Sequence, residues 1–595
     1  MQSIKNYFTS TSFVARLFFR FSPKETFISS IFFIVMGALP YLSAFLLGRM
    51  VTIIVNNVKN DNSINIWYTI ILYAFVGALP GILSNIQAYF GRYRMSKLQI
   101  ETELHILEQR EKIDIAKYEE PEFQDLIQRT FRNGPNPIYQ LGNAQFDILR
   151  SISSLVVGTF LAIHFNLWIY AIVILTAVPS FLTDVKFAGF SWSIWAKDSP
   201  EQRRFGDLRQ HINGKTFLIE TKLLQSKKKL FAWMRKILED NAQKLFSLES
   251  TRLWQTSVAD ILALCGFAVG LILVVKGVLS GIYEVGVLVY MMSTLSSVRN
   301  SIGNLLSTLS GQFENHLIVQ DMVEFFNTKP VIIESEDPKQ LKFSSAPEII
   351  FENVSFKYKN SSKYSLENIN MTFRAGENIG LVGNNGAGKT TLVKLLCRIY
   401  DPTEGRILIN GLDLKEVATA EWWSYLAVMF QDYASYDFTV KDAIAIGRPD
   451  KPTNLTKVVE AAHVSQAHTF IEEWKDKYDE QLGVEFKGKE PSKGQRQKLS
   501  IAKVLYRDGL VMILDEPTAS VDAESEAKIF DSIENLPKDR TAILISHDFS
   551  TISECDKIFV LDKGVLIEEG DHKELMKNKG LYAELYNLQA KRFKK

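Results

Sequence analysis

The sequence predicts two domains: an all-α membrane domain of six helices, followed by an α/β domain with a phosphate-binding loop. Two observations predict this fold class. Long runs without Asp, Glu, Lys or Arg occur only in the first half of the chain, and the second half contains a Gly-rich loop between a strand-like and a helical segment. The length of 595 residues is sufficient for several domains.

The composition excludes several classes of protein. Lys and Arg number 68 against 67 Asp and Glu, and 46% of the residues are hydrophobic. A nucleic-acid-binding protein carries a basic excess and a disordered protein has few apolar residues, so neither class fits. The cysteines Cys265, Cys397 and Cys555 are widely spaced and form no CxxC or Cys/His pattern. The sequence therefore predicts neither a disulfide framework nor a zinc site.

The charge-free runs predict the membrane helices. Residues 26–48 and 62–91 each predict one span, because about 20 apolar residues cross a bilayer. Residues 151–183 are long enough for two spans, which we expect to reverse at residues 164–166. Two further spans fit residues 256–275 and 283–305, so the count is six. An even count places both ends of this half on the same side of the membrane.

Basic residues predict the orientation. Lys and Arg are concentrated in residues 92–117 and 186–252, which by the positive-inside rule places these segments and the N-terminus in the cytoplasm. Both segments keep helical spacing, so we expect helices that continue out of the membrane. Residues 118–123 and 220–226 interrupt them and are candidate docking helices. The alternative is an ordinary amphipathic surface helix.

Four charged residues fall inside or beside the spans, on their cytoplasmic halves: Asp147, Arg150, Asp260 and Arg299. An ionisable group at the bilayer centre costs at least about 2.5 kcal/mol, so each one needs a partner or a function. Asp147 and Arg150 are three residues apart and can pair on one helix face. All four are candidates for the wall of a substrate cavity; the alternative is a set of interhelical pairs or interfacial side chains.

The strongest motif lies in the second half of the chain. Residues 378–382 are strand-like, residues 391–396 are helical, and a Gly-rich loop joins them. Such a loop directs backbone N–H groups at phosphates, its Lys approaches the β- and γ-phosphates, and its Thr hydroxyl binds Mg²⁺. The predicted nucleotide-binding residues of this segment are Gly383, Asn384, Asn385, Gly386, Ala387, Gly388, Lys389, Thr390 and Thr391.

A second segment completes the expected ATP site. Residues 510–514 form an apolar, strand-like run that ends in Asp515 and Glu516. At the end of a buried strand, Asp515 can lie near the metal and Glu516 near an attacking water.

These motifs, in this order, resemble the nucleotide-binding domain of ATP-binding cassette (ABC) transporters, and the chain resembles a half-transporter of the six-helix exporter type. The resemblance covers residues 15–585 and implies antiparallel β and helical subdomains in the ATPase domain. It implies an adenine contact for Tyr358, a metal contact for Gln431 and a γ-phosphate contact for His547. Ser492, Lys493, Gly494 and Gln495 match the signature motif, and Asp522 matches the D-loop.

The resemblance also implies a mechanism. Two nucleotide domains close head to tail around two ATP molecules, each held by one phosphate loop and the other subunit's signature. Glu516 would be the general base, with Lys389 and His547 as the other catalytic residues. Mg²⁺ would bind Thr390, Gln431 and Asp515. Closure would switch the membrane helices from inward-facing to outward-facing by favouring one of two packed arrangements.

The signature departs from the family pattern. The usual Leu-Ser-Gly-Gly-Gln is here Pro-Ser-Lys-Gly-Gln, so Pro491 and Lys493 replace Leu and Gly. In some heterodimers of the family, one subunit has an intact catalytic glutamate and an altered signature, and its partner has an altered glutamate and an intact signature. This chain has Glu516 and an altered signature with Lys493, so it resembles the first of these subunits. A homodimer that tolerates Lys493 is the alternative and is slightly favoured.

The resulting prediction is an ATP-driven exporter of an amphipathic peptide, lipid or drug in a cell (inner) membrane. The alternatives are an importer of exporter-like fold and a slowly hydrolysing regulatory subunit. A leader-cleaving peptide exporter is not expected, because no catalytic-Cys extension precedes the spans. The expected domains are an N-terminal segment (1–25), a membrane domain (26–320), a linker (321–345), an ATPase domain (346–585) and a basic tail (586–595). The ATPase domain is expected in the cytoplasm.

Overall fold

The computed structural model describes residues 2–60, 66–131, 134–165, 168–172, 174–176, 178–179, 182–183, 186–187, 200–359, 361–518, 520–534, 537–546 and 548–593. The chain folds into two compact units. A helical unit comprises Met1–Lys112 and Glu122–Lys329, and a sheet unit comprises Ile113–Pro121 and Pro330–Lys595. The short segment 113–121 thus belongs to the sheet unit, although the helical unit flanks it on both sides in the sequence.

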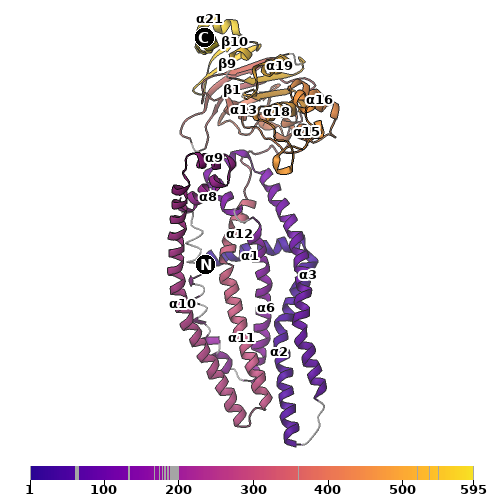
Figure 1. Cartoon of the computed structure of the whole chain (residues 1–595), viewed down its shortest axis with the longest axis vertical. Coiled ribbons are helices and arrows are strands. Elements are labelled where there is room, and N and C mark those ends of the chain that lie inside the picture. The colour runs from indigo at the N-terminus through magenta and orange to yellow at the C-terminus, as the bar shows by residue number, and fades with distance from the viewer. Residues whose placement is uncertain are drawn as a thin grey trace. The chain divides into compact units, whose positions relative to one another are not determined.

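Long helices dominate the helical unit (Figure 1). Their apolar runs contain few helix breakers, since only Pro40 and Pro80 lie inside α2 and α3. The helix α2 packs against α3, α6 and α11, and α10 packs against α11. The five longest described helices are α2 (Pro23–Asn60), α3 (Trp67–Lys112), α6 (Asn136–Phe165), α10 (Lys227–Leu279) and α11 (Val285–Gly311). Shorter helices are α1 (Gln2–Phe21), α5 (Pro121–Phe131), α8 (Pro200–Asn213), α9 (Lys215–Leu223) and α12 (Phe313–Phe326).

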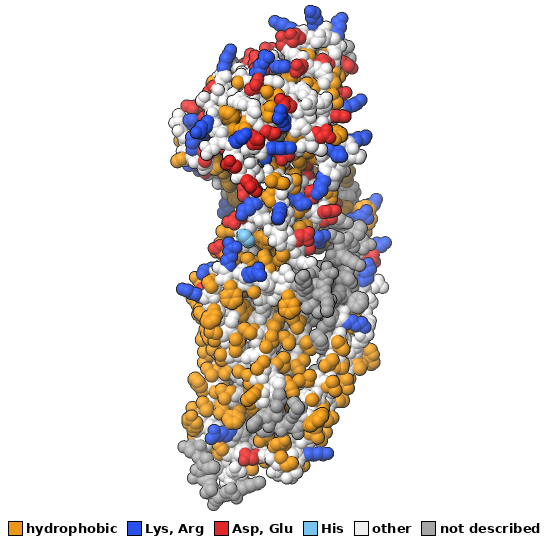
Figure 2. All heavy atoms as spheres, turned by 180° about the vertical axis from the view of Figure 1, so that it is seen from behind, with side chains coloured by type: hydrophobic (Ala, Val, Ile, Leu, Met, Phe, Trp, Pro, Cys, Tyr) orange, Lys and Arg blue, Asp and Glu red, His pale blue; other side chains and the backbone are white. Residues whose placement is uncertain are grey.

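The outer faces of the long helices are apolar. On α3, Ile71 and Phe75 are 67% and 60% exposed, and Figure 2 shows hydrophobic side chains covering the visible face of the helical unit. Of the described helices, α2, α3 and α10 are long and apolar enough to cross a bilayer by themselves. In the second half of the run 151–183, residues 166–167, 173, 177 and 180–181 lie outside the described residues, so the count of six spans stays a prediction.

Glycines bring two of these helices into backbone contact. A Cβ atom added to Gly286 of α11 would lie 2.1 Å from the carbonyl oxygen of Gly48 on α2. Small residues allow this close approach, and it compensates for the lack of a hydrophobic driving force between helices in lipid.

Two connections differ from the sequence-based expectation. Helix α12 continues to residue 326, so the linker expected at residue 321 begins later. The reason is that Met322 and Phe325 keep the helical spacing of Val319 and are fully buried. The short helix α4 (Ile115–Tyr118) ends at the first residue of the predicted docking segment 118–123, and α9 ends within the second predicted segment, 220–226.

The sheet unit contains two sheets. The six-stranded sheet has the order β10-β9-β3-β8-β7-β6, parallel except for the β9–β10 hairpin. The four-stranded sheet, β2-β1-β4-β5, is antiparallel. The strands are β1 (Ile349–Phe356), β2 (Leu366–Phe373), β3 (Asn378–Val382), β4 (Glu404–Ile409), β5 (Leu412–Asp413), β6 (Leu426–Met429), β7 (Val511–Asp515), β8 (Thr541–Ile545), β9 (Lys557–Asp562) and β10 (Val565–Gly570).

Helices surround these sheets and pack on three apolar clusters. Strands β3, β7 and β8 are buried nearly throughout, as expected for parallel strands covered on both faces. The helices are α13 (Lys389–Leu396), α14 (Thr419–Tyr425), α15 (Val440–Ala445), α16 (Leu455–Val464), α17 (His468–Glu472), α18 (Lys493–Arg507), α19 (Ala523–Glu534), α20 (Phe549–Ile552), α21 (His572–Asn578) and α22 (Leu581–Phe593). Short 3₁₀ helices are η1 (Leu414–Glu416), η2 (Lys477–Asp479) and η3 (Val484–Phe486).

Candidate nucleotide-binding site

The Gly-rich loop joins β3 to α13, as its sequence predicts. Gly388 caps the N-terminus of α13 with a φ angle of +105°. A Cβ atom at this position would lie 2.7 Å from Leu366 Cδ2 and 2.9 Å from the carbonyl oxygen of Ser365, so only glycine fits. The loop therefore directs free backbone N–H groups at the start of a helix, where a phosphate binds favourably.

Lys389 is held by the loop itself. Its Nζ atom donates hydrogen bonds to the carbonyl oxygens of Gly383 and Asn384, at 2.7 and 3.3 Å. Burial lowers the pKa of Lys389, and the nearby carboxylates of Glu516 and Asp515 oppose this shift. The carbonyl oxygens of the loop thus position the ammonium group.

Two hydrogen-bonded pairs lie at the carboxyl end of β7. Thr390 Oγ1 donates to Asp515 Oδ2 at 3.1 Å, and Gln431 Nε2 donates to Glu516 Oε2 at 2.9 Å. Asp515 is buried, whereas Glu516 is partly exposed. The backbone of Glu516 is left-handed, with φ of +50°, and its N–H donates to the carbonyl oxygen of Ile545 on β8. This corner turns the Glu516 side chain away from the strand and toward Gln431.

These groups surround one cavity of about 1020 Å³. Glu516 lines it together with nine of the predicted phosphate-loop and metal residues. Apart from Thr391, these are Asn385, Gly386, Ala387, Gly388, Lys389, Thr390, Gln431 and Asp515. Thr391 also lines it. The sequence analysis missed Lys363, Tyr364, Ser365 and Lys563, which also line the cavity and lie before β2 and in the β9–β10 turn. No local motif marks them, because the fold alone brings these segments to the loop.

Tyr358, the expected adenine contact, lies beside Thr391 and two other aromatic residues. Its hydroxyl group lies 3.2 Å from Thr391 Oγ1, and its ring packs edge-on against Phe356 and Tyr400. Tyr358 is not among the residues that line the cavity, whereas Tyr364 is. The adenine contact of Tyr358 therefore stays a prediction.

The signature segment starts helix α18. Ser492 Oγ accepts from Gln495 N at 3.2 Å and Gln495 Oε1 accepts from Ser492 N at 2.9 Å, which forms a capping box. Lys493 is exposed and takes no part in this cap. Gly494 is constrained, because an added Cβ atom would lie 2.6 Å from the carbonyl oxygen of Ser520.

The same helix is tied to the D-loop. Lys498 Nζ donates to Asp522 Oδ2 at 3.0 Å, and the Gln497 side chain accepts from Ser520 N at 2.9 Å. Hydrogen bonds from Ser525 and Lys498 lower the pKa of Asp522 well below its usual range. Neither Asp522 nor the signature residues line the phosphate-loop cavity of the same chain. His547 lies outside the described residues.

The predicted cavity residues of the helical unit are only partly brought together. Asp147 and Arg150 line a cavity of about 500 Å³ between α2, α6 and α11. Asp260 and Arg299 do not line it. The ion pairs of the described residues do not include Asp147 with Arg150, so the predicted pairing is not observed.

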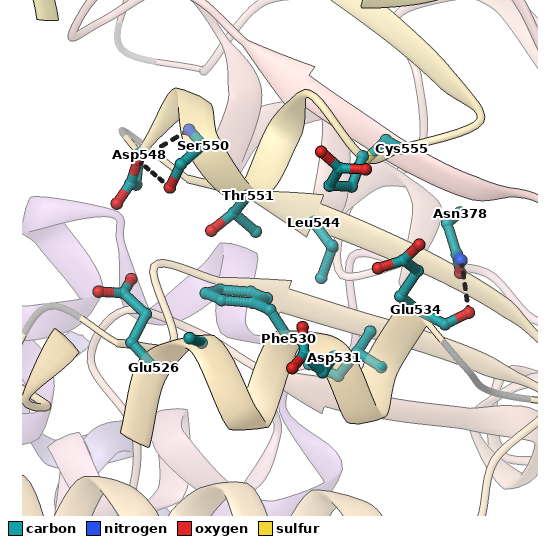
Figure 3. A pocket seen from close by; sticks show the side chains of 13 residues that line it. Asn378, Glu526, Phe530, Asp531, Glu534, Leu544, Asp548, Ser550, Thr551 and Cys555 are labelled. Carbon is teal, nitrogen blue, oxygen red and sulfur yellow. Dashed lines mark hydrogen bonds between the residues drawn. The ribbon is translucent and has the colours of Figure 1, made fainter. Parts of the chain in front are cut away.

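A second cavity of the sheet unit, of about 530 Å³, lies between α19 and α20 (Figure 3). Phe530 and Leu544 are apolar residues of its wall, while Glu526, Glu534 and Asp548 supply carboxylates. Ser550 donates two hydrogen bonds to Asp548 there. None of the site residues predicted from the sequence lines this cavity, so the candidate site remains the cavity at the phosphate loop.

Comparisons with known proteins match the region that contains this site. The ABC transporter family matches residues 366–519. SpaT of Bacillus subtilis, a subtilin transport ATP-binding protein, is 26% identical over 557 residues, which cover 93% of this chain and 90% of SpaT. YgaD of B. subtilis, an ATP-binding/permease protein assigned by name to multidrug export, is 33% identical over 313 residues, 52% of this chain and 53% of YgaD.

A solved structure extends the similarity to the fold. The structure of a bacterial Atm1-family ABC exporter with ATP bound has a TM-score of 0.80 and 21% sequence identity, covering 96% of this chain and 99% of that chain. The predicted fold class, a helical transmembrane domain followed by an α/β P-loop ATPase domain with an antiparallel sheet, is confirmed. The similarity indicates an ATPase whose hydrolysis of ATP is coupled to transport, in a chain that resembles a half-transporter of the ABC exporter type.

Proposed function

We propose that two such chains form an exporter that moves an amphipathic compound, a peptide, a lipid or a drug, out of the cytoplasm. The observation that carries the proposal is the cavity where the phosphate loop meets the end of β7, in a chain whose helical unit exposes long apolar faces. Subtilin transport and multidrug export, named for SpaT and YgaD, are consistent with this direction and with an amphipathic substrate.

We expect Mg²⁺ at Thr390, Asp515 and Gln431. The Thr390 hydroxyl and the Asp515 carboxylate are 3.1 Å apart, and oxygen atoms in this arrangement fit a small, hard cation. When bound with ATP, the ion supplies positive charge that stabilises phosphoryl transfer. Asp515 holds the threonine hydroxyl in position for this ligation.

Each remaining residue of the site has a separate task. Lys389 exchanges its loop carbonyl partners for phosphate oxygens, and the loop backbone holds the other phosphate oxygens. Glu516 orients the attacking water and accepts its proton once the bond from Gln431 is released. The family resemblance assigns His547 to the γ-phosphate and Tyr358 to the adenine.

The signature acts on the partner subunit's ATP. This role is supported by its absence from the cavity lining of its own chain and by the exposure of Ser492 and Lys493. We favour a homodimer, because Lys493 lies outside the capping box and leaves the helix start intact. A heterodimer is the second possibility, since Lys493 replaces the glycine of the family pattern.

The helical unit is proposed to span a cell (inner) membrane, with the N-terminus and the ATPase domain in the cytoplasm. We propose residues 26–320 as the transmembrane domain and 346–585 as the ATPase domain. Helix α12 extends the helical part beyond residue 320, so the linker between the two domains starts after residue 326. The segment 113–121 and the region around α9 are the proposed docking segments. In the sheet unit, Glu119 contacts Lys394 and Tyr400, and Glu120 contacts Lys359, which supports a docking role for the first segment.

The test is ATP turnover by the purified chain in lipid, beside the Glu516→Gln variant. We expect turnover by the wild type and at least about a hundredfold loss in the variant, the usual contribution of a general base. Glu524→Gln, on the exposed start of α19, is the matched control and should keep wild-type turnover. Equal turnover in Glu516→Gln would contradict the assignment, and no turnover by folded wild type would indicate a heterodimer.

A further inference from the structure

The cavity between α2, α6 and α11 is polar although it lies among predicted spans. Of its twelve lining residues, only Met36, Gly37 and Pro40, all on α2, are apolar or lack a side chain. The other lining residues carry hydroxyl, amide or charged groups. Such groups at membrane depth are costly unless they meet each other, water or a substrate.

Helix α11 contributes one continuous stripe to this wall. Ser297, Asn300, Asn304 and Thr308 recur at intervals of three and four residues, so they share one face of the helix. Asn300 and Asn304 are exposed toward the cavity in the single chain. Each asparagine offers two donors and an acceptor along the stripe.

Helix α6 contributes a second stripe with charges. Asp147, Arg150 and Ser154 follow the same spacing. The opposite face of α6 carries Val156 and Phe160, which are 63% and 74% exposed, as expected of a surface in contact with lipid. The two faces of one helix therefore meet different surroundings, one apolar and one polar.

The hydroxyl groups at one part of the cavity are hydrogen-bonded to each other. Ser301 Oγ donates to Ser154 Oγ at 2.6 Å, and Tyr41 Oη lies 3.1 Å from the same atom. At the other end, Asp147 and Arg150 are exposed and one turn apart, and neither makes a hydrogen bond or an ion pair with the described residues. One negative and one positive group are thus available to a ligand.

We propose that the transported compound enters this cavity as a zwitterionic, peptide-like chain rather than as an apolar cation. This inference rests on the proposed export function. A peptide backbone presents alternating N–H and C=O groups, which match the amide and hydroxyl stripe of α11. Its ammonium group pairs with Asp147 and its carboxylate with Arg150, and the volume of about 500 Å³ suits a small ligand.

The experiment measures equilibrium binding of radiolabelled tetrapeptides of glycine and serine to the full chain in lipid nanodiscs. The peptides have free ends, an acetylated amine or an amidated carboxylate, and tetraphenylphosphonium is the apolar cation. We expect the free peptide to bind at least about tenfold more tightly than either blocked form, the usual range for a charge-assisted bond. Tighter binding of tetraphenylphosphonium than of the free peptide would overturn the proposal.

Variants test which end of the peptide pairs with Asp147 and which with Arg150. In Asp147→Asn the acetylated and free peptides should bind alike, and in Arg150→Gln the amidated and free peptides should bind alike, while Arg150→Lys keeps the wild-type preference. The double variant Asn300→Leu/Asn304→Leu should weaken all three peptides, and Ser310→Leu, outside the lining on α11, is its control. Unchanged binding in both charge variants, or in the asparagine double variant, would overturn the proposal.

ATP turnover is measured on the same samples, so the two hypotheses fail separately. Peptide binding without turnover would count against the proposed transport ATPase of this chain alone and leave the cavity assignment in place. Turnover without peptide binding would overturn the substrate class and leave the ATPase intact.

Discussion

The cavity at the phosphate loop and the cavity between α2, α6 and α11 are built differently. At the phosphate loop, the polar groups are paired within the chain: Lys389 bonds to loop carbonyls, and Glu516 accepts from Gln431. In the helical unit, Asp147 and Arg150 face the cavity without such partners. The first site is assembled from loop backbone and strand ends, and the second from side chains on helix faces. A substitution should therefore affect the first cavity by disturbing backbone packing, and the second cavity by removing a charge or polar group that binds the ligand.

The strongest test of this difference is Gly494→Ala. Its added Cβ atom would meet the carbonyl oxygen of Ser520 at 2.6 Å, so α18 and the D-loop must separate. Overpacking of this kind costs about 1–3 kcal/mol, and we expect ATP turnover to fall about tenfold or more. Gly303→Ala on α11 is the control, since no heavy atom lies within 4 Å of its added Cβ. An equal loss of ATP turnover in the two variants would contradict a specific effect of the close contact between Gly494 and Ser520.

A smaller effect is expected where the sheet unit is held by ion pairs. Burial raises the pKa of Glu119, but hydrogen bonds from Lys394 and Tyr400 hold it below its ordinary value; a bond from Lys117 lowers the pKa of Glu120. Partly exposed ion pairs contribute up to about 1 kcal/mol each. Glu119→Gln/Glu120→Gln should therefore lower the melting temperature of the full chain in detergent at neutral pH.

The stabilisation by the ion pairs of Glu119 and Glu120 should decrease as the pH falls. Because both pKa values are lowered by folding, the stabilisation is present above the unfolded pKa and is lost as pH falls through the folded values. The difference in melting temperature between wild type and the double variant should shrink in acid, below about pH 4. Glu122→Gln, at an exposed carboxylate next to the segment, should match wild type at both pH values. A difference that grows in acid would contradict these ion pairs.

The smallest effect is expected at the altered signature. Lys493 is exposed and the capping box uses Ser492 and Gln495 instead, so Lys493→Gly should change turnover by less than about threefold. The measurement is ATP turnover of the purified variant in lipid, with the exposed Lys528→Gly on α19 as the control for loss of a lysine. A rise of tenfold or more would indicate that the natural signature is impaired and favour a heterodimer.

Sequence reasoning named most of the residues that line the candidate nucleotide site, because they lie in two short segments and one glutamine. Residues 383–391 are contiguous, and the run before Asp515 is recognisable as a buried strand. Lys363 and Lys563 could not be found in this way, because strand pairing brings them to the loop from segments far apart in sequence. The linker was expected to begin at residue 321, but the buried residues Met322 and Phe325 continue helix α12 to residue 326.

Only the charged residues of the polar cavity between α2, α6 and α11 were predicted from the sequence. Asp147 and Arg150 stand out in an apolar segment, whereas Asn300 and Asn304 are neutral and escape a search for charges. Their spacing was nevertheless a usable signal, since residues at i and i+4 share a helix face. Which face of α11 meets α6 rather than lipid depends on packing, for example at Gly158 of α6, where an added Cβ atom would lie 2.6 Å from Val298 Cγ2 on α11.

The left-handed backbone of Glu516 has a consequence for folding. A side chain in this conformation costs of the order of 1 kcal/mol relative to glycine, which adopts it freely. The chain therefore gives up conformational stability at the position where it places its carboxylate next to the phosphate loop. The bond from Glu516 N to Ile545 on β8 is part of what holds the strained corner in place. The fold therefore keeps a locally unfavourable backbone at Glu516, among the residues that line the cavity at the phosphate loop.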